Sequence, residues 1–150
     1  VGSEMCIRDS PSTIRRAPVP ACETLRGWRV IAEPGALDTL SWSSASDDSI
    51  VLRLAPDDAL LLGATQVHVD DPHAIVEPDA GWCGWRFSPA EFAAQLAHRV
   101  EWTIPAKGPA LAQGLVAGVP AKLWFADDGT VLVICAAAYA TELADRIVAK

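Results

Sequence analysis

Hydrophobic and polar positions alternate over several short stretches in the first half of this chain, which is typical of half-buried β-strands. An uninterrupted apolar run indicates one further strand. The strands predicted in this way cover residues 27–32, 50–54, 59–62 and 65–69. Pro34, Pro56 and Pro72 mark ends of these strands, and the polar segment 41–49 predicts a loop.

The second half has a clearer pattern of strands and helices. Its predicted strands cover residues 74–77, 82–87, 113–116, 120–125 and 130–135, with a turn at 79–81 between the first two and a turn around Gly118 between the third and fourth. Ser88, Pro89 and Glu91 together indicate the start of a helix, because serine caps the end, proline fits the first turn and glutamate completes a capping box. This helix is predicted over residues 89–100, and a terminal helix over residues 136–148.

The order of these elements predicts the fold class. From residue 74 onward it is two strands, a helix, three strands and a helix, which favours an α+β fold. We expect an antiparallel sheet with two helices on one face, ferredoxin-like in character, as a single domain over residues 27–150. Residues 11–26 are expected to form a loop or arm. Residues 1–10 (VGSEMCIRDS) resemble a translated sequencing adapter, so we expect a non-native segment outside the fold.

Composition and charge exclude several classes of function. Hydrophobic residues make up 51% of the chain and charged residues 21%, as in ordinary globular proteins. The net charge of -7 disfavours nucleic acid and anionic membranes as partners. Outside the adapter-like segment the cysteines are Cys22, Cys83 and Cys135, with no CxxC spacing. They predict reduced, mostly buried thiols in a cytoplasmic protein.

Two local groups of residues resemble chemical sites. The segment 82–85 (WCGW) lacks the second cysteine of a thioredoxin motif, so we expect Cys83 and Trp85 to pack in the core, with Trp82 on the opposite face. The second group has metal-ligand residue types: His68, Asp70, Asp71 and His73. Because Pro72 lies within it, a solvated turn is the favoured interpretation, and a small metal enzyme remains a weaker alternative.

No complete active site is indicated by the sequence. The aspartate pairs at 47–48, 57–58 and 127–128 each lie at a predicted turn, where aspartate forms local hydrogen bonds. A phosphate-binding glycine loop, a Gly-x-Ser-x-Gly elbow and a His-Glu-x-x-His motif are all absent from the sequence. We therefore predict no catalytic residue and no metal site, and leave cofactor-binding residues open.

The tryptophan content indicates a binding surface. Six tryptophans are many for a domain of this size, and tryptophan is enriched at protein interfaces. The residues predicted to contribute to a partner interface are Trp28, Trp42, Trp82, Trp102 and Trp124.

Three segments also carry a resemblance to a known family. They are LRLAPDDALLLG over 52–63, AIVEPDAGWCGWRFSPAEFAAQL over 74–96, and GLVAGVPAKLWFADDGTVLVICAAAYATELADRI over 114–147. In pattern and order they resemble the gamma subunit of heterotetrameric sarcosine oxidase. More broadly, they resemble the folate-binding part of the glycine-cleavage T-protein (aminomethyltransferase) superfamily.

The resemblance implies a ferredoxin-like core and an accessory role. In that family the gamma subunit is a small chain, and the larger subunits hold the flavin and tetrahydrofolate. We therefore expect a non-catalytic subunit of a sarcosine oxidase-like complex in one-carbon metabolism, packed against larger subunits. No carboxylate follows Gly118 where catalytic T-proteins have one, so aminomethyl transfer is not expected. The alternative is a stand-alone module that binds folate or another small ring between tryptophans.

Overall fold

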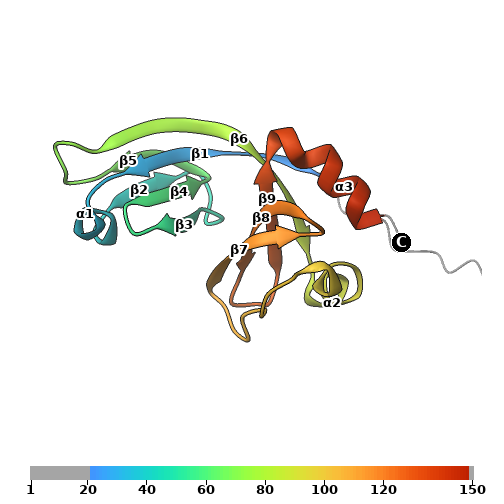
Figure 1. Cartoon of the computed structure of the whole chain (residues 1–150). Coiled ribbons are helices and arrows are strands. Elements are labelled where there is room, and N and C mark those ends of the chain that lie inside the picture. Colours follow the sequence, from blue (N-terminus) through green and yellow to red (C-terminus); the bar gives the residue numbers. More distant parts are fainter. Residues whose placement is uncertain (1–20, 149–150) are drawn as a thin grey trace, which may run out of the picture.

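The alternating segments form the strands of a mostly β fold in the computed structural model, which describes residues 21–148 (Figure 1). Seven strands form one antiparallel sheet in the order β3-β4-β1-β6-β9-β8-β7. They are β1 (Glu23–Ile31), β3 (Ile50–Ala55), β4 (Asp58–Leu62), β6 (Ile75–Phe87), β7 (Ala110–Val116), β8 (Val119–Phe125) and β9 (Val131–Ala136). Two further strands, β2 (Ser41–Ser44) and β5 (Ala64–His68), pair separately as an antiparallel ribbon.

Short helices flank this sheet. They are α1 (Pro34–Asp38), α2 (Pro89–Gln95), α3 (Ala140–Val148) and the 3₁₀ segments η1 (Ala97–Arg99) and η2 (Ala137–Tyr139). Figure 1 shows β1 and β6 running side by side along the molecule. They join a part that holds α1 and β2–β5 to a part that holds β7–β9, α2 and α3. Both parts therefore share the same two strands.

The sheet curls until it is nearly closed and barrel-like. Its two outer strands, β3 and β7, meet where the side-chain amide of Gln113 donates a hydrogen bond of 2.9 Å to the carbonyl of Leu54. Leu54 and Leu111 also pack against one inner apolar cluster. The buried members of this inner cluster are Leu25, Leu52, Leu60, Leu62, Leu132 and Ile134.

Two more clusters cover the outside of the sheet. On the side of α2 and α3, the helix-side cluster includes Trp85, Phe92 and Leu143. On the side of α1 and the β2–β5 ribbon, the hairpin-side cluster is formed by Val30, Ala32, Leu37, Ala59 and Leu61. Since β4 and β9 contribute to clusters on both faces, their nearly uninterrupted apolar sequences are explained.

The predicted ferredoxin-like α+β core is wrong, and β6 gives the main reason. The sequence predicted two strands, at 74–77 and 82–87, divided by a turn at 79–81. Instead β6 runs unbroken, and its register with β1 pairs Gly27 with Asp79 but Leu25 with Trp82. Two β6 residues therefore oppose one β1 residue, so the turn-like signal marks a β-bulge. One long strand replaces two, and it pairs with β1 from the first half.

Other sequence predictions have mixed outcomes. The capping box is confirmed: the Ser88 hydroxyl accepts from the Glu91 N–H at 3.3 Å, and the Glu91 carboxylate accepts from the Ser88 N–H at 2.8 Å. The helix it starts ends at Gln95, earlier than predicted, and continues only as η1. The predicted loop 41–49 contains strand β2. Residues 1–10 lie outside the described residues, and β1 begins at Glu23 within the predicted arm.

Candidate functional site

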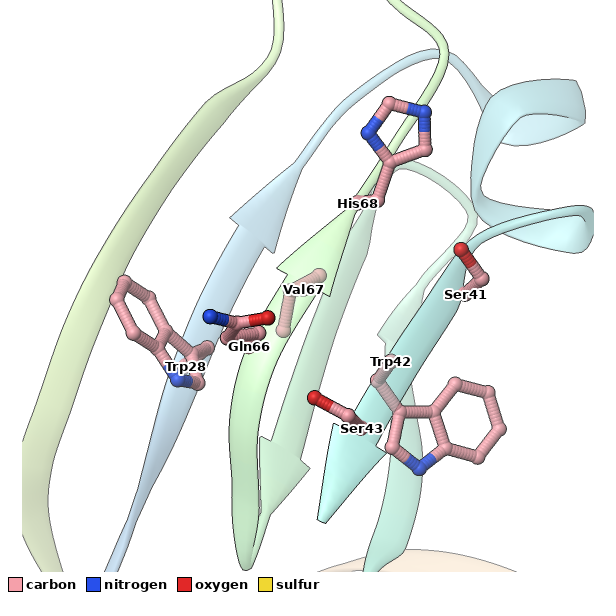
Figure 2. A pocket seen from close by; sticks show the side chains of 7 residues that line it. All are labelled: Trp28, Ser41, Trp42, Ser43, Gln66, Val67 and His68. Carbon is pink, nitrogen blue, oxygen red and sulfur yellow. The ribbon is translucent and has the colours of Figure 1, made fainter.

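Two of the predicted interface tryptophans line one open hollow. Strand β1 supplies Trp28 and strand β2 supplies Trp42, at the edges of a depression of about 430 Å³ (Figure 2). The remaining lining residues come from β2 and β5, namely Ser41, Ser43, Gln66, Val67 and His68. The hollow thus forms where the β2–β5 ribbon lies against the long strand β1.

The two indoles do not face each other. Figure 2 shows the Trp42 ring pointing away from Trp28, with Gln66 and Ser43 between them in this view. Trp42 is 44% exposed, and its indole N–H donates to the Ser49 hydroxyl at 3.1 Å. Trp28 is half-buried. The site is consequently an open surface with aromatic groups on two sides, and a ring could not stack between this pair.

The other three predicted interface tryptophans are half-buried and belong to the apolar clusters. Trp82 and Trp124 pack against the inner cluster, and Trp102 packs against the helix-side cluster. Trp102 also covers Gly114, where an added Cβ would lie 2.8 Å from the indole ring. Trp28 and Trp42 therefore line one hollow together, whereas the other three pack on the apolar clusters.

The cysteine prediction holds in part. Cys135 is buried and Cys83 is half-buried, as expected, but Cys22 is exposed. Although the residue is exposed, partial desolvation of its thiol, a hydrogen bond with Cys83 and the charge of Cys83 raise the pKa of Cys22 to about 11. Burial also raises the pKa of Cys135 to about 11. Trp85 is 2% exposed in the helix-side cluster, so the core interpretation of the WCGW segment is confirmed for that residue.

The group from His68 to His73 spans the end of β5 and the turn that follows it, as favoured from the sequence. The Asp71 carboxylate accepts hydrogen bonds from the backbone N–H groups of Glu33, at 2.9 Å, and His73, at 2.8 Å. These two bonds lower the pKa of Asp71. Within residues 21–148, no group of three or more histidine, cysteine, aspartate or glutamate side chains could hold a metal ion.

The aspartate pairs have turn roles with one exception. Asp128 accepts from the backbone N–H of Thr130 at 2.8 Å, as a turn aspartate should. Asp58 instead forms a bidentate ion pair with Arg29 of the neighbouring strand β1. Sequence reasoning missed this pair because the partners lie far apart in the chain. Side chains alternate along a strand, so the sequence could indicate only that Arg29 and Trp28 lie on opposite faces of β1.

A second hollow was also missed from the sequence. It lies beside Trp82 and Lys122 at one mouth of the barrel-like sheet and has a volume of about 470 Å³. The Lys122 ammonium lies 4.8 Å from the centre of the Trp82 ring. The only indication of this hollow in the sequence was Lys122 itself, a charged residue within the otherwise apolar strand β8.

The chain was compared with protein families, curated proteins and solved structures. No family model, no curated protein and no solved structure matches it. In the described part of the chain, no helix has the length and apolar character needed to cross a membrane.

Proposed function

We propose that this chain is a non-catalytic accessory subunit, which binds a larger protein through the hollow lined by Trp28 and Trp42. One observation carries the proposal. These two tryptophans belong to none of the three apolar clusters, yet both line the same hollow. Tryptophan side chains that are partly exposed and gathered at one place are typical of binding hot spots, because a partner removes their large apolar area from water.

Neighbouring apolar residues extend this surface. The register of β1 with β6 pairs Trp28 with Pro78 and Val30 with Val76, so Val76 lies on the same face of the sheet as Trp28. Val76 is 37% exposed. A partner that covers the hollow can therefore also bury part of β6, which adds the apolar area that stable interfaces require.

The resemblance to the gamma subunit of sarcosine oxidase supplies the partner to test first. Under this proposal the partner is the large flavin-containing part of a sarcosine oxidase-like complex, and the larger subunits hold flavin and tetrahydrofolate. This part of the proposal rests on the sequence pattern of three segments, since the fold that the resemblance implied is not the one found.

Co-expression with the alpha and beta subunits of such an oxidase tests the proposal. The tagged chain is expected to co-purify with them as a stable complex. Trp28→Ala and Trp42→Ala are each expected to weaken binding by about 2 kcal/mol, roughly thirtyfold in Kd, which is the size of a hot-spot effect. Tyr139→Ala is the matched control, because Tyr139 is also 44% exposed but lies at the other hollow.

The partner's identity and the docking surface are tested by different outcomes. Absence of co-purification would refute the sarcosine oxidase assignment. Co-purification that both tryptophan variants leave unchanged would refute the hollow as the docking surface. Equal losses in the Tyr139 and Trp42 variants would show that the partner covers a different or much wider face.

A small-ligand module is the second candidate function. It is favoured by the hydrogen-bonding side chains of Ser41, Gln66 and His68 in the same hollow. Tryptophan fluorescence during titration with tetrahydrofolate tests it, and saturable quenching lost in Trp28→Phe is the expected result. A flat titration removes this candidate.

A further inference from the structure

The hollow at the mouth of the barrel-like sheet combines one cation with apolar walls. It is bounded by residues of β6, β7, β8 and β9 and by Tyr139 of η2, and its volume of about 470 Å³ suits a small molecule. Leu115, 42% exposed, and Tyr139, 44% exposed, form its apolar rim. Lys122 is the only charged residue among the residues that line it.

The side chains around Lys122 hold it over an aromatic face. Its ammonium lies 4.8 Å from the centre of the Trp82 ring, within the range of a cation–π contact. The Trp82 indole is itself fixed, since its N–H donates to the Asp79 carboxylate at 2.8 Å. The Asp79 carboxylate also accepts the backbone N–H of Gly81 at 2.9 Å. A rigid indole thus places the cation at the entrance of the hollow.

Lys122 lacks a paired anion within the described part of the chain. None of the four ion pairs among these residues includes it. Burial and the charge of Arg29 lower the pKa of Lys122, while the Asp58 carboxylate has the opposite effect. The Asp58 carboxylate already pairs with Arg29. The Lys122 ammonium, which is partly desolvated by burial, is therefore open to an external anion.

From this geometry we propose that the mouth hollow binds a small monocarboxylate with an apolar or aromatic tail. The carboxylate binds the Lys122 ammonium, and the tail packs against Leu115 and Tyr139. A single lysine matches a single negative charge, whereas a phosphate needs more donors, and the guanidinium of Arg29 is occupied by Asp58. This site is independent of the hollow at Trp28 and Trp42.

Titration of the ¹⁵N-labelled full chain with 3-phenylpropionate tests the proposal. We expect saturable shifts of the Trp82 indole N–H and the Leu115 amide, with a millimolar Kd as suits so small a ligand. The neutral analogue 3-phenylpropionamide has the same shape and is expected to bind at least about tenfold more weakly, because it lacks the charge that pairs with Lys122.

Variants assign the effect to the ammonium. Lys122→Met keeps the apolar stem and is expected to lose the preference for carboxylate over amide, while Lys122→Arg keeps it. Lys107→Met removes an exposed lysine at another hollow and should leave binding unchanged. Trp42→Ala should also leave it unchanged, so failure of this site and failure of the partner-binding proposal are distinguishable.

Several results would overturn the proposal. They are equal affinity for acid and amide, unchanged carboxylate binding in Lys122→Met, shifts confined to other surfaces, and no shift at saturating probe. If Lys122→Met fails to fold, the comparison of acid with amide on the wild-type chain and on Lys122→Arg still decides the question.

Discussion

Gly27→Ala is expected to destabilise the fold strongly, because β4 leaves no room for a side chain there. A Cβ at residue 27 would overlap the carbonyl oxygen of Leu61 and lie 2.7 Å from the carbonyl carbon of Leu61 and 3.0 Å from the Cα of Leu62. These are backbone atoms of a strand whose residues Leu60 and Leu61 are at most 1% exposed. They cannot move aside without disturbing the pairing of β1 with β4.

The size of the effect follows from two contributions. Forcing an extra methyl group into a packed interior costs about 1–3 kcal/mol. Displacing β4 also strains the Gly27–Leu62 and Trp28–Leu61 pairings, and each weakened hydrogen bond costs about 1 kcal/mol. We therefore expect a loss of at least about 3 kcal/mol, a large share of the roughly 5–15 kcal/mol that stabilises a typical domain.

Urea unfolding followed by tryptophan fluorescence measures this loss. Gly35→Ala is the matched control, since nothing lies within 4 Å of the added Cβ and the residue is in helix α1. Alanine is favoured over glycine in a helix by about 0.5–1 kcal/mol, so this variant should be neutral or slightly more stable. If the free energy of unfolding of Gly27→Ala is within about 1 kcal/mol of the wild-type value, the close approach of β1 to β4 is incorrect, and so is the placement of Trp28.

Three further predictions concern the inner cluster, the α2 cap and the thiols. Leu132→Ala should cost about 2–5 kcal/mol in urea unfolding, because Leu132 is 1% exposed inside the barrel-like sheet; a loss below about 1 kcal/mol would contradict that position. Ser88→Ala should cost about 1 kcal/mol in the same assay, and Ser88→Thr, which keeps the hydroxyl that contacts Glu91, should restore most of it, whereas equal losses in both would exclude a capping role. Cys22 has a pKa of about 11 against the ordinary 9.0, so its thiolate is about a hundredfold scarcer at pH 8, partly offset by greater nucleophilicity. Its reaction with a disulfide reagent can be measured by peptide mass spectrometry in a Cys6→Ser background. The reaction at pH 8 should be about tenfold slower than that of an ordinary exposed cysteine, and its rate should rise with pH up to about pH 11. A rate that levels off near pH 9 would contradict the raised pKa.

Local signals in the sequence predicted most strands and one helix start. The apolar run at 59–62 lies within β4, and the Ser88 capping box begins α2. Both features depend on neighbouring residues alone, so they are readable without the fold. The predicted turn around Gly118 is also found: it joins β7 to β8, and Ala117 and Gly118 both have positive φ there.

Features that depend on distant pairing were not predicted. Asp79 and Gly81 give the same local signal in a turn and in a bulge, and only the pairing of β6 with β1 distinguishes them. That one choice changed the predicted fold class. The candidate site was predicted only in part. The tryptophan content indicated Trp28 and Trp42, but the sequence could not show that Trp82, Trp102 and Trp124 pack on the clusters. The approach of Lys122 to Trp82 needs the curl of the sheet.

The sharing of β1 and β6 by both parts of the molecule has a consequence for synthesis on the ribosome. The pairing of β1 with β4 can form once residue 62 has left the exit tunnel, but the other edge of β1 must wait for residues 75–87. β6 in turn waits for β9, at residues 131–136. Open strand edges therefore persist until residue 136 has emerged, and the nascent chain is a natural client for chaperones that shield such edges.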